Sequence, residues 1–170
     1  MALGMEERLN EFLTYARRAY GDLQNPDYGF FAEALTTEPW RPVVDQLRQF
    51  LRVEDWTDRE DDVSFSYVLK TGRRSPAWSL WLSAVGPFAL LVYIPGDADL
   101  VRADAVTKGR ADRPPEEARI VGVLQEAGLQ LLSAEEVEAS VDFRPMDGRF
   151  PVSVFLLLFG DSDVPWWHVS

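Results

Sequence analysis

Apolar residues in the first 51 positions recur every three or four residues, which is the spacing of one helix face. This pattern predicts an amphipathic helix over Glu6–Tyr20 that ends at Gly21. A short helix over Tyr28–Leu35 follows. A third and more regular helix is predicted over Trp40–Leu51, with Thr37 as its N-cap and the nearby prolines confined to its first turn.

After position 62 the spacing changes to alternation, which is typical of strands. Strands are predicted over Val63–Lys70, Trp78–Ala84 and Phe88–Ile94, and short connections make them an antiparallel meander. The third is a continuous apolar run, typical of a strand covered on both faces. Ser75–Gly96 is uncharged and long enough to cross a membrane, but Gly86-Pro87 interrupts it, so we expect a buried hairpin.

The segment from 97 to 113 mixes both charges without a period and is expected to form a surface loop. A helix then opens at Pro114-Pro115 and ends at Gly128, and Leu129–Leu132 could add a short strand.

Two signals compete in the next segment. Ser133 and Glu136 have capping-box spacing, whereas alternation continues to Phe143, so we expect at most one turn of helix and then a strand. Asp147-Gly148 reverses the chain into a second strand, Val152–Phe159.

This order of elements predicts an α+β fold in a single domain spanning residues 1–170. The antiparallel β-sheet would consist of the three-strand meander plus a C-terminal hairpin, with the N-terminal helices and one inserted helix packed on it. We expect the helices to gather on one side of the sheet.

Composition narrows the possible functions. The chain has 170 residues, of which 46% are hydrophobic, and no cysteine, so it can bury a core without disulfides and cannot form thiolate metal sites. Charged residues interrupt its N-terminus where an export signal needs an apolar core, so we expect a cytoplasmic protein. A net charge of −11 disfavours nucleic-acid binding.

Signatures of common catalytic and cofactor sites are missing from the sequence. The single histidine, His168, has no Gly-x-Ser-x-Gly nucleophile motif to serve, and neither a phosphate-binding loop nor a dinucleotide fingerprint is present. Asp58, Glu60 and Asp62 have the spacing of calcium ligands, but Val63 stands where such a loop needs glycine. We therefore expect no cofactor or metal, and a protein that is not an enzyme.

Negative charge is concentrated in two windows, Glu54–Asp62 with a net −5 and Glu135–Asp147 with a net −4. They could be solvated loops or a docking surface for a basic partner. A C-terminal segment beside two aspartates carries adjacent tryptophans, which could pin the chain end to the core or anchor an interface. The candidate partner-binding residues are Asp55, Trp56, Asp58, Glu60, Asp61, Asp62, Asp161, Asp163, Trp166 and Trp167.

The leading hypothesis is a protein-binding module. In charge, size and lack of catalytic motifs, the chain is similar to small cytoplasmic immunity proteins that neutralise bacterial toxins, which implies a basic toxin as partner and masking as mechanism. One alternative is a carboxylate-dependent, possibly metal-assisted enzyme built on Asp97 and Asp99 or on Asp161 and Asp163. Another is a homo-oligomer sealed by exposed tryptophans.

Overall fold

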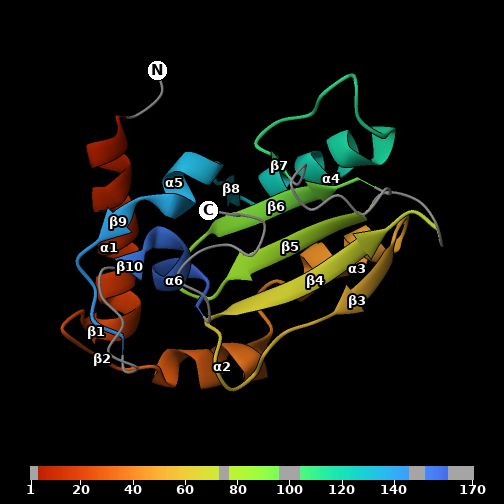
Figure 1. The fold of residues 1–170 in the computed structure, drawn as a ribbon. Coiled ribbons are helices and arrows are strands. Elements are labelled where there is room, and N and C mark those ends of the chain that lie inside the picture. The colour runs from red at the N-terminus through yellow and green to blue at the C-terminus, as the bar shows by residue number, and fades with distance from the viewer. Residues whose placement is uncertain (1–3, 73–76, 96–103, 146–151, 161–170) are drawn as a thin grey trace.

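A computed structural model of the chain describes residues 4–72, 77–95, 104–145 and 152–160. An antiparallel sheet runs through the molecule, and helices cover both of its faces (Figure 1). The predicted α+β fold, with its meander and C-terminal hairpin, is confirmed. The expectation of helices on one side only is wrong, because the central strands carry apolar side chains on both faces and each face requires a cover.

Strands β4 (Ser64–Lys70), β5 (Ala77–Ser83) and β6 (Phe88–Ile94) form the predicted meander. β3 (Arg52–Asp55) pairs with β4 at one edge of the sheet. β7 (Asp104–Ala105) pairs antiparallel with the second half of β6. β8 (Gln130–Leu131) pairs parallel with the start of β6. The order is therefore β3-β4-β5-β6-β7, with β8 beside β6.

One face of the sheet packs against α3 (Arg41–Arg48) and α4 (Pro115–Glu126), with Phe31 of α2 (Gly29–Thr37) at the edge. Alternate strand residues point to this side because successive side chains of a strand leave opposite faces. The strand residues in this core are Phe65, Tyr67, Leu69, Trp78, Leu80, Leu82, Ala89 and Leu91.

The opposite face packs against α1 (Met5–Tyr20), α5 (Ala134–Glu138) and α6 (Val154–Leu158). Phe12 of α1 meets Phe88 of β6 edge-on, with ring centroids 5.2 Å apart. Two small hairpins flank this layer. One joins β1 (Gly21–Asp22) to β2 (Asn25–Pro26), and the other joins β9 (Ser140–Val141) to β10 (Val152–Ser153).

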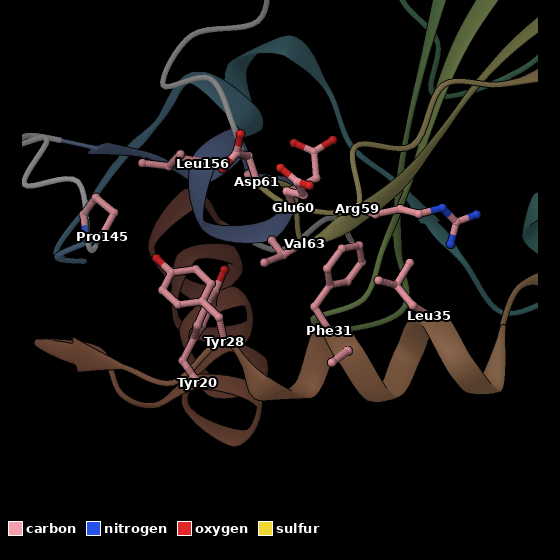
Figure 2. Close-up of a pocket in the computed structure, with 13 residues that line it drawn as sticks. Tyr20, Tyr28, Phe31, Leu35, Arg59, Glu60, Asp61, Val63, Pro145 and Leu156 are labelled. Atoms are coloured by element: carbon pink, nitrogen blue, oxygen red, sulfur yellow. The ribbon is translucent and has the colours of Figure 1, made fainter.

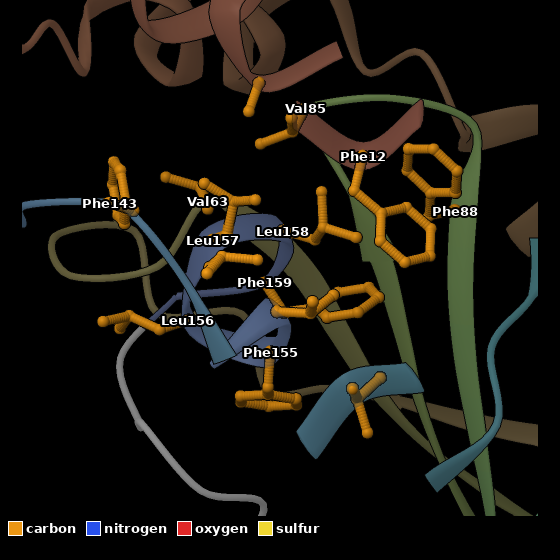
Figure 3. Close-up of a cluster of buried hydrophobic side chains, with 14 of the residues drawn as sticks. Phe12, Val63, Val85, Phe88, Phe143, Phe155, Leu156, Leu157, Leu158 and Phe159 are labelled. Carbon is orange, nitrogen blue, oxygen red and sulfur yellow. The ribbon is translucent and has the colours of Figure 1, made fainter. Parts of the chain in front are cut away.

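The strand predicted over Val152–Phe159 is wrong beyond its first two residues. β10 ends at Ser153, whose side chain accepts a hydrogen bond from the backbone N–H of Leu156 and so caps α6. All five residues of α6 are buried, and its side chains radiate in every direction into the core (Figure 3). A short run that is apolar on every side carries no period, so the sequence cannot separate a buried helix from a buried strand.

Two boundaries near the third helix also differ from prediction. Thr37 is the last residue of α2 rather than an N-cap, and Trp40 holds the N-cap position of α3. The Trp40 indole donates a hydrogen bond to the backbone oxygen of Ser83 (2.8 Å), which fixes the start of the helix against the sheet. α3 ends at Arg48 because the chain then turns into β3, an edge strand that begins the predicted acidic loop.

A buried charge joins α4 to the sheet. Glu117 is fully buried, and its Oε1 accepts hydrogen bonds from the Trp78 indole (2.9 Å) and the Arg113 guanidinium (3.0 Å). Arg113 also pairs with Asp104 of β7 at 2.7 Å and lies 4.1 Å from the centre of the Tyr93 ring. One carboxylate oxygen thus connects α4 and β5, and through Arg113 it reaches β7.

Removing this carboxylate should cost more than removing its neighbour. Glu117→Leu is expected to lower the free energy of unfolding by about 3 kcal/mol, because it leaves buried donors of Trp78 and Arg113 without an acceptor. Glu116→Leu is the control, since Glu116 lies in the same first turn of α4 and should cost less than about 1 kcal/mol. Urea unfolding followed by circular dichroism compares them, and equal losses would contradict this role of Glu117.

Candidate functional site

The acidic residues that follow β3 form a compact turn, Asp58–Asp62, which we call the acidic turn. Asp58 Oδ1 accepts hydrogen bonds from the backbone N–H groups of Glu60 (3.0 Å) and Asp61 (3.1 Å). Short carboxylate side chains favour this kind of local capping. The Asp58 carboxylate is therefore directed to its own backbone, and the turn that it stabilises presents the carboxylates that follow.

A cavity of about 610 Å³ lies beside the acidic turn, and we call it the acidic pocket. The carboxylates of the turn lie on one side of it, and the rings of Tyr20, Tyr28 and Phe31 lie on the other (Figure 2). Arg59 also belongs to the wall. The remaining lining residues are Ala32, Leu35, Val63, Pro145, Leu156 and Gly160.

The floor of the pocket is held by the carboxyl end of α6, whose last backbone oxygens have no partner within the helix. The Tyr20 hydroxyl donates to Leu157 O (2.7 Å), and the Ser83 hydroxyl donates to Leu158 O (2.6 Å). Phe159 O accepts from the Ser64 hydroxyl (2.8 Å) and from the backbone N–H of Val63 (3.2 Å). Side chains from α1, β4 and β5 thus fix α6 in place. We call this group the α6 carbonyl network.

Burial has a consequence for the Tyr20 phenol. Its pKa lies well above the usual value of 10, first because the group is desolvated and second because Tyr28 is near. Tyr20 is therefore neutral at physiological pH and donates its proton to Leu157 O. Among the described residues that line the acidic pocket, the charged ones all come from the turn, which contributes three carboxylates and the guanidinium of Arg59.

This arrangement suits a cation. Carboxylates attract positive charge, and they do so more strongly beside an apolar wall than in bulk water. The faces of tyrosine and phenylalanine rings also attract ammonium and guanidinium groups. A cavity of this size falls within the range of roughly 300–1,000 Å³ that is usual for ligand sites.

The structure separates the residues predicted to form one acidic surface. Glu60, Asp61 and Asp62 line the acidic pocket, whereas Asp58 caps the turn. Asp55 is not among the residues that line this pocket, and its Oδ1 accepts a hydrogen bond from the backbone N–H of Thr57 (2.9 Å).

Trp56 is 67% exposed and is not part of the pocket wall. Its indole N–H donates to Glu54 Oε2 (3.4 Å), and this hydrogen bond is the main reason that the pKa of Glu54 is lowered, with Lys70 and Arg52 adding to it. Asp161, Asp163, Trp166 and Trp167 lie outside the described residues, as do Asp97 and Asp99.

Sequence patterns did not predict the aromatic residues of the pocket wall. Tyr20, Tyr28 and Phe31 fit helix-face patterns, and nothing in their spacing separates a pocket wall from a core. Pro145 and Leu156 come from a segment more than 80 residues beyond the acidic turn, so only the tertiary fold brings the parts together.

Among the residues described, no group of three or more histidine, cysteine, aspartate or glutamate side chains could hold a metal ion. Within the same ranges, no helix has the length and apolar character needed to cross a membrane.

Gly160 closes the acidic pocket where it pairs with Asp62 in an isolated antiparallel bridge. Its φ of +85° is in the left-handed region, and a Cβ there would lie 2.9 Å from the backbone nitrogen of Val63. Glycine is thus required both by conformation and by space.

Two glycine variants separate these requirements. Gly160→Ala should lower the free energy of unfolding by about 3 kcal/mol, because a left-handed alanine costs about 1 kcal/mol and overpacking against backbone adds about 2 kcal/mol. Gly128 has a φ of +84° but open space around it, so Gly128→Ala should cost only the conformational part. Thermal or urea unfolding gives both values. A loss at Gly160 no larger than that at Gly128 would show that the approach to Val63 is not tight.

Comparison with known proteins adds no relative from which a function could be transferred: no family model, no curated protein and no solved structure matches the chain.

Proposed function

We propose that the chain is a protein-binding module for a basic partner, and that the acidic pocket receives a cationic side chain of that partner. The observation that supports this most directly is the placement of Glu60, Asp61 and Asp62 at the wall of an aromatic cavity. An acidic loop alone would be solvated on all sides and would discriminate little. Here the carboxylates stand beside apolar surface, where charge pairing is stronger and geometry is restricted.

The charge of the whole chain supports the same proposal at longer range. A net −11 raises the rate at which positively charged molecules approach, and salt weakens this effect. The pocket would then add short-range selection, because only a group that is both cationic and slender enough to reach the rings gains all of its contacts.

The specific form that we propose is an immunity protein that masks a basic toxin. Masking a toxin requires a surface that is complementary to it in shape and charge, and no catalytic step. The acidic turn supplies negative charge that would complement a basic surface. Its backbone is also held before any partner arrives, by Asp58 within the turn and by the bridge between Asp62 and Gly160 at its end. A turn ordered in advance loses less entropy on binding.

Binding of a fluorescently labelled oligoarginine peptide tests the proposal by fluorescence anisotropy. The double variant Glu60→Gln/Asp61→Asn should weaken binding by about tenfold or more, because charged pairs beside apolar surface contribute the most. It should also reduce the dependence of Kd on salt.

The matched control is Glu7→Gln/Glu126→Gln, which removes the same charge from exposed positions on α1 and α4. This variant should change Kd by less than about twofold, since exposed and distant charges are screened. Equal weakening by the two double variants would mean that overall charge, and not the acidic pocket, attracts the peptide.

A further inference from the structure

A second, smaller cavity collects positive charge in this acidic molecule. It has a volume of about 200 Å³ and shares Leu35 and Arg59 with the acidic pocket. Arg41 and Arg48 complete its basic side, and we call it the arginine pocket. Three guanidinium groups face two carboxylates there, whereas the chain as a whole has 28 acidic and 17 basic residues.

The secondary structure explains why the arginines converge. Arg41, Val44 and Arg48 lie three and four residues apart on α3, so they share one face of the helix. Phe65 and Tyr67 alternate along β4 and point to the side of the sheet that α3 covers. Arg59 enters from the acidic turn.

The guanidinium groups keep donors to spare. Arg41 pairs with Glu38 at 3.3 Å and with Asp45 at 4.0 Å, and these groups are more than half exposed. Arg48 reaches Asp45 at 3.5 Å. Arg59 reaches Asp55 at 3.9 Å. Such long pairs in water are weak, and each guanidinium carries five N–H donors, so most of its donors are not used by these partners.

Tyr67 adds a hydroxyl to this cavity. The residue is only 9% exposed and lines the arginine pocket. Burial raises the pKa of Tyr67 to about 12, with Asp55 adding to the shift and Arg48 opposing it. The phenol is thus protonated at neutral pH and has a proton to donate.

We propose that the arginine pocket binds a small oxyanion, a carboxylate or phosphate group, through the guanidinium groups of Arg41, Arg48 and Arg59 and the Tyr67 hydroxyl. Planar guanidinium groups pair with both kinds of oxyanion through two parallel hydrogen bonds. The Tyr67 hydroxyl would supply a further donor. This site is separate from the function proposed above and does not depend on it.

Nuclear magnetic resonance of the arginine side chains tests the proposal. Inorganic phosphate and, in a separate titration, acetate are added at constant ionic strength while the Nε–Hε signals are followed. Saturable shifts of the Arg41, Arg48 and Arg59 signals support the site. Response to phosphate alone identifies a phosphate group as its ligand, and response to both identifies a general oxyanion site. Absence of saturation with either anion would overturn the proposal.

Variants locate the binding. Arg48→Gln and, separately, Tyr67→Phe should each raise the Kd for the bound anion by about tenfold, because hydrogen bonds to charged groups are among the stronger ones.

Arg52→Gln is the control, since Arg52 carries the same charge on β3 and is 67% exposed outside the pocket. It should change Kd by less than about twofold. An Arg52→Gln effect as large as that of Arg48→Gln would show non-specific attraction and overturn the assignment. Arg48 lies on the surface, so that variant keeps the test valid even if Tyr67→Phe disturbs the core.

Discussion

The backbone oxygens at the carboxyl end of α6 impose the constraint on which the rest of the molecule depends. A helix buried on every side cannot pass its last carbonyl groups to water, and an unpaired buried carbonyl costs about 1–3 kcal/mol. In the α6 carbonyl network, side-chain hydroxyls from α1, β4 and β5 donate hydrogen bonds to these carbonyl groups. This network explains why serines occupy the fully buried positions Ser64 and Ser83, which pair with each other at the ends of β4 and β5.

This constraint also positions the candidate site. The backbone of Val63 and the side chain of Ser64 hold Phe159, and the next residue, Gly160, pairs with Asp62. The acidic turn is therefore attached at its carboxyl end to the same element that fills the core. Its preceding residues are held by Asp58, so the turn is fixed by contacts at both ends.

Sequence patterns predicted those parts of the fold in which a period is visible. The Glu6–Tyr20 helix and the three meander strands were located to within one or two residues. Helical spacing located the helix, alternation located β4 and β5, and a continuous apolar run after Gly86-Pro87 located β6. α6 was misassigned since every side is buried, and β3 was missed since an edge strand rich in charge resembles a loop.

For the candidate site, the clustering of negative charge in the sequence pointed to Glu60, Asp61 and Asp62. The aromatic wall lies too far along the chain for any local pattern to reveal it.

The bridge between Asp62 and Gly160 also ties the proposed binding site to the completion of folding. The residues it joins lie almost 100 positions apart, and contacts of such separation form late because they must close a long loop. A nascent chain still lacking residues 152–160 would carry the acidic sequence without the wall that gives it shape. The same late residues fill the core and complete the acidic pocket, so the proposed binding would require a finished interior, and a partly folded molecule would present charge without selectivity.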